Sequence, residues 1–163
     1  LSEAVKEAKG IHTMEDFETT IDLNMDAFIP DSYISNEYQK LDIYKRIAGI
    51  ENQQDYDDML EELLDRFGEL PKAVMNLLTI AKIKALAHRV YVTEIKQLGR
   101  DLKITLYEKA QLNPAGMPAL LQKYRRGLQF KNEQEVKFIL TPEGKVLDSL
   151  TEFLLALEKM VEE

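Results

Sequence analysis

The 163-residue sequence has no cysteine, no tryptophan and only two histidines. Without cysteine the chain has no disulfide, no thiolate zinc site and no cysteine nucleophile, which is typical of a protein from the reducing cytoplasm. It also has no run of about 18 apolar residues and no N-terminal signal pattern, so we expect neither a transmembrane helix nor a secreted protein. Because the chain begins with Leu1, we expect it to be a piece of a longer protein.

Basic residues are outnumbered, with 21 Lys and Arg against 29 Asp and Glu and a formal net charge of −8. This balance argues against a general nucleic-acid coat protein, although local basic patches remain possible. Hydrophobic residues make up 45% and charged residues 31% of the chain, as in ordinary globular domains.

The common catalytic motifs are missing as well. The sequence contains no GxxxxGK[ST], GxGxxG, GxSxG or HExxH pattern, so no phosphate-binding loop, nucleophile elbow or zinc helix can be identified. We expect His12 to be solvated in a linker and His88 to lie at the boundary of the core. The chain is therefore predicted to have no catalytic, metal or cofactor-binding residues.

The first half of the chain is predicted to be mostly helical. Alternating Ile21, Leu23 and Met25 indicate a strand before a turn at Pro30-Asp31. Helices are then expected from Ser35 to about Gly49, over Gln53–Phe67, and from Pro71 to about Val90, the last being apolar around most of its circumference. The apolar faces of the first two helices would include Tyr38, Leu41 and Leu64.

After residue 90 the pattern returns to strands. A hairpin around Gly99, Arg100 and Asp101 is followed by a short helix with Asn113 as its N-cap, two more strands, and a last helix over about 142–161. The predicted fold class is α+β, a small antiparallel sheet packed with about five helices.

The helix over 53–67 is unusually acidic. Seven carboxylates and no Lys or Arg occur between Glu51 and Asp65, and Asp58, Glu62 and Asp65 share one strip by their i, i+4, i+7 spacing. One interpretation is a solvated face whose first carboxylates compensate the helix dipole. Glu62 and Asp65, however, lie near the C-terminal end, where the dipole disfavours negative charge. We interpret Asp58, Glu62 and Asp65 as a docking strip for a surface that carries Lys or Arg.

A small basic cluster lies in the second half. Lys123, Arg125, Arg126 and Lys131 surround Tyr124 and Phe130. Such a group is a possible DNA contact through phosphates, and a mixed solvated surface is the alternative.

Three motifs identify a family. The stretch "IPDSYISNEYQKLDIYKRIAGIENQQDYDDMLEELLDRFGELPKAVMNLL" contains an "IP-x-x-YI" turn, then "L-x-x-YKRIA", then "EL-x-DRFG-x-LP". With their spacing, these resemble the C-terminal domain of the bacterial transcription-repair coupling factor (Mfd). The resemblance is strongest over Ile29–Leu78 and covers essentially the whole chain. It departs at Lys40, where the family pattern has Arg, and lysine cannot make a bidentate contact at that position.

The resemblance implies a parent protein that is an ATP-driven DNA translocase of the bacterial cytoplasm. The parent displaces stalled RNA polymerase, recruits UvrA of nucleotide-excision repair, and uses ATP and Mg in its motor, which this chain lacks. Residues 1–19 would be the tail of the motor domain and a linker, and 20–163 a C-terminal regulatory domain.

The resemblance also implies a partner. Glu62 and Asp65 would contact the UvrB-like module of the same polypeptide and hide its UvrA-binding surface, an autoinhibitory role without catalysis. RNA polymerase and DNA would be reached through other domains, and no membrane is involved. An accessory DNA-contacting domain is the alternative.

Overall fold

The computed structural model describes residues 17–161, so His12 and the predicted first helix lie outside the described residues. The chain divides into two compact units. Unit 1 contains the residues up to Leu23 and those from Ala87 onward, and unit 2 contains Asn24–Leu86. Each unit has its own core.

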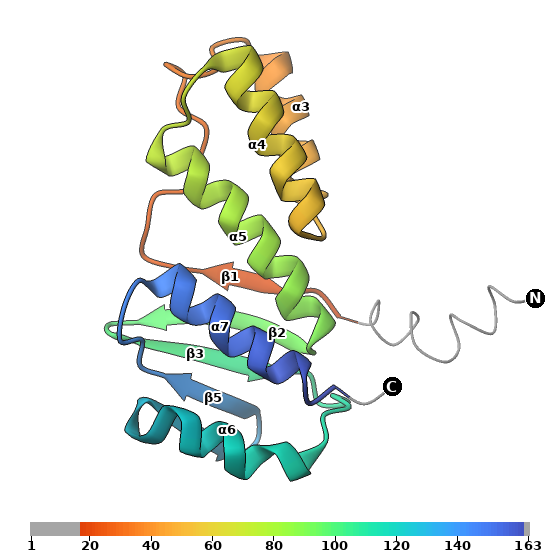
Figure 1. The fold of residues 1–163 in the computed structure, drawn as a ribbon, viewed down its shortest axis with the longest axis vertical. Coiled ribbons are helices and arrows are strands. Elements are labelled where there is room, and N and C mark those ends of the chain that lie inside the picture. The colour runs from red at the N-terminus through yellow and green to blue at the C-terminus, as the bar shows by residue number, and fades with distance from the viewer. Residues whose placement is uncertain (1–16, 162–163) are drawn as a thin grey trace, which may run out of the picture. The chain divides into compact units, whose positions relative to one another are not determined.

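The elements in chain order, labelled as in Figure 1, are β1 (Thr20–Asp22), α3 (Glu37–Ala48), α4 (Gln53–Phe67), α5 (Lys72–Arg89), β2 (Val92–Leu98), β3 (Asp101–Leu106), α6 (Met117–Tyr124), β4 (Leu128–Asn132), β5 (Val136–Leu140) and α7 (Val146–Glu158). The described residues thus contain five α-helices and a five-strand, mostly antiparallel sheet, which confirms the predicted α+β class.

Unit 2 is built from α3, α4 and most of α5. Its buried core is formed by Ile29, Ile34, Ile43, Ile47, Ile50, Met59, Leu63, Val74 and Leu78. The side-chain oxygens of Asn36 and Asn52 cap α3 and α4 by accepting hydrogen bonds from the backbone N–H of Gln39 and Asp55, at 3.0 and 2.8 Å. Gly49 and Gly68 end the two helices, as the sequence predicts.

Two tyrosines tie the segment before α3 to the helices. The hydroxyl of Tyr33 lies 3.2 Å from the carbonyl oxygen of Leu63 and 2.9 Å from that of Gly68. The hydroxyl of Tyr44 accepts a hydrogen bond from the backbone N–H of Ile29 at 2.7 Å. These contacts satisfy backbone groups at the end of α4 and in the loop, so the "IP-x-x-YI" and "YKRIA" motifs contribute to the local structure.

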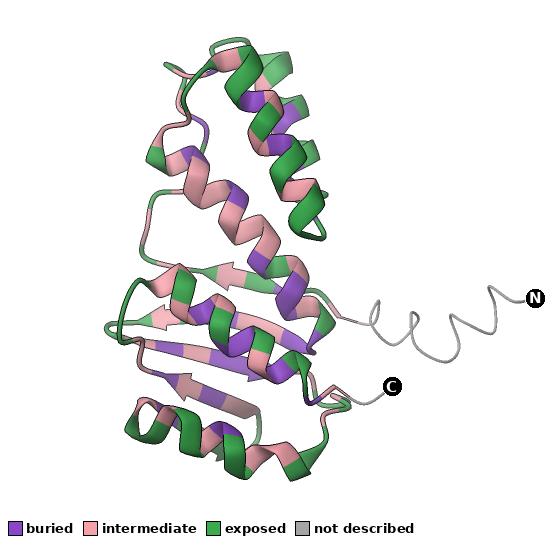
Figure 2. Ribbon diagram, in the orientation of Figure 1, coloured by how far each residue is buried: buried purple, intermediate pink, exposed green. Residues whose placement is uncertain are grey.

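Unit 1 contains the sheet, in the order β1-β2-β3-β5-β4. β1 pairs with β2 in parallel, and the other pairs are antiparallel. Helices α6 and α7 lie on the same side of the sheet (Figure 1). Figure 2 shows buried residues along the strands and along α7, where the helix crosses the sheet. The ring of Phe153 on α7 contacts that of Phe138 on β5 at 5.2 Å between centroids.

Some sequence predictions were wrong in detail. β1 has only three residues, so Leu23 and Met25 lie outside the strand, because their alternation in the sequence has no partner strand beyond Asp22. Tyr38 is 87% exposed and Leu41 55% exposed, because the core of unit 2 lies on the side of α3 that carries Ile43 and Ile47. Leu64 is also exposed, at 47%.

Candidate docking surface

The predicted docking strip follows one side of α4, and its three members have different surroundings. Asp58 and Asp65 are exposed, whereas Glu62 is half-buried. The Nε2 amide of Gln54 donates a hydrogen bond to the Asp58 carboxylate at 2.8 Å, one turn earlier on the same helix. The three carboxylates therefore do not form a uniform row.

Glu62 is the best-anchored of the three. The guanidinium of Arg46 on α3 donates two hydrogen bonds to its carboxylate, at 2.6 and 2.5 Å, and Arg66 donates another at 2.8 Å. These bonds and the positive charges lower the pKa of Glu62 from its ordinary value of 4.5 to about 2. Glu62 therefore links α3 to α4, and its charge is compensated within the domain.

A shallow hollow opens beside this ion pair, between the two helices. It is lined by Arg46, Gly49, Ile50, Asp55, Asp58, Met59 and Glu62. Asp55 is itself used locally, because its carboxylate accepts a hydrogen bond from the backbone N–H of Glu51 at 3.0 Å. The hollow therefore combines a fixed guanidinium with carboxylates at its rim.

Among the three carboxylates of the docking strip, that of Asp65 is the most available to a partner. Within residues 17–161 its carboxylate takes part in no hydrogen bond or ion pair, and the same holds for Glu61 one turn earlier. The two are exposed like charges at i and i+4, which repel, and Asp65 lies in the last turn of α4, where the helix dipole adds to the penalty. This part of α4 is thus less stable than a neutral or basic sequence would make it.

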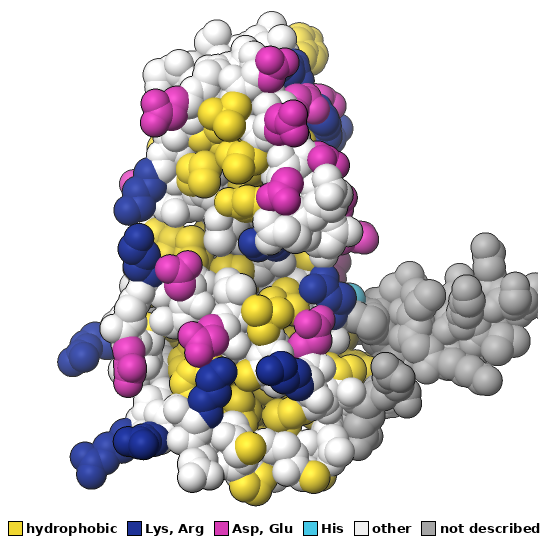
Figure 3. All heavy atoms as spheres, in the orientation of Figure 1, with side chains coloured by type: hydrophobic (Ala, Val, Ile, Leu, Met, Phe, Trp, Pro, Cys, Tyr) yellow, Lys and Arg dark blue, Asp and Glu magenta, His cyan; other side chains and the backbone are white. Residues whose placement is uncertain are grey.

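The charge of the described chain is unevenly divided. Unit 2 has twelve Asp and Glu against seven Lys and Arg, whereas the described part of unit 1 has eleven against twelve. Acidic side chains outnumber basic ones on the visible face of the α3–α4 region in Figure 3. The acidic excess of the described residues therefore belongs to unit 2.

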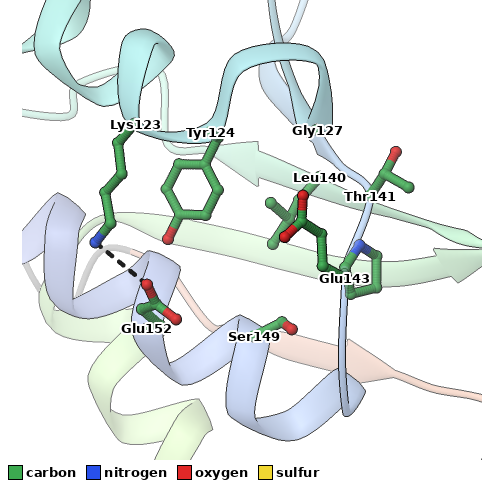
Figure 4. Close-up of a pocket in the computed structure, with 9 residues that line it drawn as sticks. Lys123, Tyr124, Gly127, Leu140, Thr141, Glu143, Ser149 and Glu152 are labelled. Carbon is green, nitrogen blue, oxygen red and sulfur yellow. Dashed lines mark ion pairs between the residues drawn. The ribbon is translucent and has the colours of Figure 1, made fainter.

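The structure does not gather the predicted basic residues into one patch. Lys123 on α6 pairs with Glu152 on α7 at 3.4 Å (Figure 4). Arg125 and Arg126 lie in the turn after α6, where Arg125 has a φ of 51°. Lys131 on β4 is directly opposite Lys137 on β5, on the side of the sheet away from α7.

A small pocket lies between α6 and α7, lined by Lys123, Tyr124, Gly127, Leu140, Thr141, Pro142, Glu143, Ser149 and Glu152 (Figure 4). Burial, together with the nearby Glu152 carboxylate, raises the pKa of Tyr124 to about 12. Its hydroxyl has no hydrogen-bond partner among the described residues.

His88 has a structural environment, as expected. Its Nε2 atom lies 3.0 Å from the carbonyl oxygen of Phe17, and its ring contacts the Phe17 ring at 4.5 Å between centroids.

The described residues contain no group of three or more His, Asp and Glu placed to hold a metal ion. Among residues 17–161 no helix is both long and apolar enough to span a membrane.

Sequence reasoning missed the arginines that bind Glu62. Arg66 follows Glu62 by four residues, which is a readable i, i+4 signal. Arg46 is 16 residues away, and only the packing of α3 against α4 brings it to Glu62. The position of Lys40 is likewise set by packing, since its ammonium pairs with Asp31 in the preceding loop.

Comparison with known proteins adds a family assignment. Residues 23–117 match the family model described as "TRCF domain". The chain is 33% identical over 163 residues to the transcription-repair-coupling factor of Bacillus subtilis (strain 168), and 36% identical over 164 residues to that of Staphylococcus aureus (strain USA300). Each alignment covers 98% of this chain and 14% of the relative.

A solved structure agrees with this match. The crystal structure of a C-terminal domain of transcription-repair coupling factor superimposes with a TM-score of 0.77 at 27% identity, and the alignment covers 88% of this chain and 94% of that one. Because the chain spans about 14% of the length of the curated relatives, the likeness concerns this one domain. The chain belongs to the TRCF-domain family, the C-terminal domain of transcription-repair coupling factors.

Proposed function

We propose that this domain is a non-catalytic regulatory module that docks through α4 onto a basic surface elsewhere in its parent polypeptide. The parent would be a transcription-repair coupling factor, an ATP-driven DNA translocase of transcription-coupled nucleotide-excision repair. The partner would be its UvrB-like module, and docking would mask the surface that binds UvrA. In this proposal residues 20–163 are the regulatory domain, and residues 1–19 connect it to the motor.

The observation that carries the proposal is the unused charge of Asp65. Its carboxylate is exposed, unpaired within the described residues, next to the like charge of Glu61, and placed where the helix dipole disfavours it. Each of these costs is removed when a Lys or Arg of a partner approaches. An exposed charge that destabilises its own helix fits a surface selected for an interaction.

Glu62 has a different role in this proposal. Its two arginines hold it in place, so Glu62 fixes the packing of α3 against α4. The partner then meets a preorganised surface, in which the Arg46 guanidinium and the Asp58 carboxylate line the same hollow. Preorganisation lowers the entropy cost of association. Alternating charge also sets orientation and association rate more than affinity.

The proposed mechanism is a two-state lock. A few charge-assisted contacts favour the closed state, and a competing ligand or a movement of the motor favours the open one. Losing one partner of a well-placed charge pair costs about 1–3 kcal/mol, which shifts such an equilibrium by roughly tenfold or more. Interfaces of this kind within one chain are polar and modest in area.

The test uses the full-length parent. Asp65→Lys should open the lock, raising UvrA binding and basal ATPase activity by about tenfold. Asp26→Lys makes the same charge change at another exposed position of unit 2, outside α4, and should change neither. If both variants leave UvrA binding and ATPase activity at the wild-type level while the domain stays folded, docking through Asp65 is wrong.

The alternative function, a DNA contact through Lys123, Arg125, Arg126 and Lys131, has weaker support. Lys123 is already paired with Glu152, and Lys131 lies on the other side of the sheet.

A further inference from the structure

One side of the sheet in unit 1 carries no helix among the described residues. The buried apolar side chains of the strands face α6 and α7, and the alternate positions face the other way. These outward positions are Thr20, Asp22, Glu94, Lys96, Leu98, Asp101, Lys103, Thr105, Gln129, Lys131, Lys137 and Ile139. We call this set the open face.

On the open face, two pairs of lysines lie directly opposite each other on neighbouring strands. Lys96 on β2 is directly opposite Lys103 on β3, and Lys131 on β4 is directly opposite Lys137 on β5. Directly opposed like charges destabilise a sheet, because the side chains of such a pair are close neighbours on one face. Two such pairs in one small sheet are a cost in stability that an ordinary solvated face would avoid.

The four lysines form a diagonal row. Because β2, β3, β5 and β4 are adjacent in that order, the row crosses three strand spacings, about 14 Å at ~4.8 Å each. The pairing of Thr105 with Lys137, and of Lys103 with Ile139, offsets the second pair from the first by two residues. A line of separate ammonium groups over this length matches a run of phosphates, not a single anion.

Acidic neighbours compensate only part of this charge. Glu94 pairs with Lys103 at 3.1 Å, and Glu133 lies 3.8 Å from Lys137. Lys96 and Lys131 are exposed and form no ion pair within residues 17–161, although Asp22 on β1 neighbours Lys96 in register. The two ends of the row therefore carry the available charge.

The open face also holds an unused hydroxyl. Thr105 is 7% exposed and lies between Glu94 and Lys137 in register. Its Oγ1 atom is buried and has no hydrogen-bond partner among the described residues, which is unusual for a buried polar group. Because this atom is inaccessible to solvent, Thr105 is a covered point beside the lysine row, and the lysines alone present groups that a bound phosphate can reach.

We propose that the open face binds the phosphate backbone of duplex nucleic acid, without sequence specificity, through Lys96, Lys103, Lys137 and Lys131. Lysine is a point-charge phosphate ligand, and it is depleted in protein–protein interfaces, which favour aromatic anchors. No outward strand position of the described sheet is aromatic, so the face lacks a platform for stacking the bases of a single strand. This surface lies in unit 1, does not include α4, and is independent of the docking proposal.

The test is fluorescence anisotropy of a labelled 20-base-pair duplex with this 163-residue chain, from 25 to 150 mM NaCl. Affinity should be weak, in the 10⁻⁴–10⁻⁶ M range typical of non-specific binding, and the log–log salt slope should be about −3 to −4 for four contacts. Lys96→Glu/Lys131→Glu should weaken binding at low salt more than tenfold and make the slope shallower by about two. Absence of salt-dependent binding by the wild type would overturn the proposal.

Stability provides a second readout that separates binding from folding. Lys96→Glu/Lys131→Glu converts both like-charge pairs into opposite-charge pairs, but Lys96→Glu also places a carboxylate opposite Asp22 on β1. The stability readout therefore uses Lys131→Glu alone, whose Tm should rise while its DNA affinity falls. The matched control for the double variant, Lys72→Glu/Lys84→Glu, makes the same charge change at two exposed positions of α5 and should weaken binding less than threefold. An equal loss of DNA affinity in the control variant would show that the net charge of the chain alone determines binding. That result would contradict a specific binding face.

Two further arms distinguish other occupants. A single strand of the same length should bind no more tightly than the duplex, and tighter binding would contradict the duplex assignment. Polyglutamate at equal charge concentration should displace the labelled duplex poorly. If it displaces the labelled duplex as effectively as unlabelled duplex does, the open face binds an acidic protein and not DNA. Arg125→Glu/Arg126→Glu, outside the row, should retain most of the affinity, and a loss as large as that of the sheet variant would relocate the site.

Discussion

Arg46 on α3 and Glu62 on α4 form a bidentate ion pair, with hydrogen bonds of 2.6 and 2.5 Å, that joins the two helices of unit 2. Arg66 adds a third hydrogen bond to the same carboxylate. Glu62 and Asp65 are three residues apart on one helix, yet the first is compensated inside the domain and the second is not. The acidic strip therefore combines a structural residue with an available one.

The ion pair should contribute measurably to stability. Glu62→Gln keeps the shape of the side chain and removes its charge, so we expect the free energy of unfolding to fall by about 1 kcal/mol, since bidentate pairs are stronger than simple ones but this pair is partly screened by solvent. A double-mutant cycle with Arg46→Met, measured by urea denaturation, isolates the coupling. A coupling energy near zero would mean that the pair forms without stabilising the fold.

The same pair predicts a pH dependence. The pKa of Glu62 is lowered in the folded state to about 2 from an ordinary 4.5, so its contribution is fully present above pH 4.5 and is lost as the pH falls from 4.5 towards 2. The difference in unfolding free energy between wild type and Glu62→Gln should therefore shrink over this window. Urea denaturation at pH 7, 4.5, 3 and 2.5 measures it. A difference that stays constant to pH 2.5 would assign the effect to something other than charge.

Much of the fold could be predicted from the sequence, because local signals determine it. Gly49 and Gly68 end helices, Asn113 caps the turn before α6 with its side chain, and the apolar period of α7 matches its buried residues Leu150, Phe153, Leu154 and Leu157. The exposure of Tyr38 and Leu41 could not be predicted, because an apolar residue next to a buried stripe has the same period whether or not a neighbour covers it.

The site could be predicted only in part, for a similar reason. Helical spacing places Asp58, Glu62 and Asp65 on one side of α4, but the arginine from α3 depends on the helix–helix packing. The two lysine pairs of the open face each lie within a hairpin, β2–β3 or β4–β5. Their alignment into one row depends on the register of β3 against β5, which hairpin lengths leave undetermined because these strands are not consecutive in the chain.

Asp65 should show a trade-off between stability and docking. Asp65→Lys removes the repulsion with Glu61 and places a favourable charge in the last turn of α4, so the isolated domain should gain about 0.5–1 kcal/mol in unfolding free energy. The same change should weaken docking in the full-length parent, where Asp65 would meet a basic partner. Urea denaturation of this chain, at 20 and 500 mM NaCl, checks the first part.

The salt dependence identifies the cause of that gain. A stabilisation that comes from charge should decrease at 500 mM NaCl, because exposed charges are screened. Asp65→Asn, which removes the negative charge without adding a positive one, should give about half of the effect. If Asp65→Lys destabilises the isolated domain, its carboxylate has a structural role and the docking interpretation loses its main support.

Gly68 should be intolerant of substitution for a backbone reason. Its φ of 88° and ψ of −165° lie in a region that is essentially restricted to glycine, although no atom lies within 4 Å of an added Cβ. Gly68→Ala should therefore cost about 1–3 kcal/mol through backbone strain and not through a clash. The carbonyl oxygen of Gly68 also faces the Tyr33 hydroxyl at 2.9 Å, so the end of α4 should loosen where Asp65 lies.

Gly144 provides the matched control. It likewise has no atom within 4 Å of an added Cβ, but its φ is not in the left-handed region, so Gly144→Ala should be neutral or slightly stabilising through the unfolded chain. Thermal unfolding followed by circular dichroism compares the two variants, and hydrogen exchange at residues 63–68 reports the local effect. If Gly68→Ala is as stable as Gly144→Ala, the end of α4 adopts another backbone conformation at no cost in free energy. In that case α4 does not need glycine at position 68 to hold Asp65 at the surface.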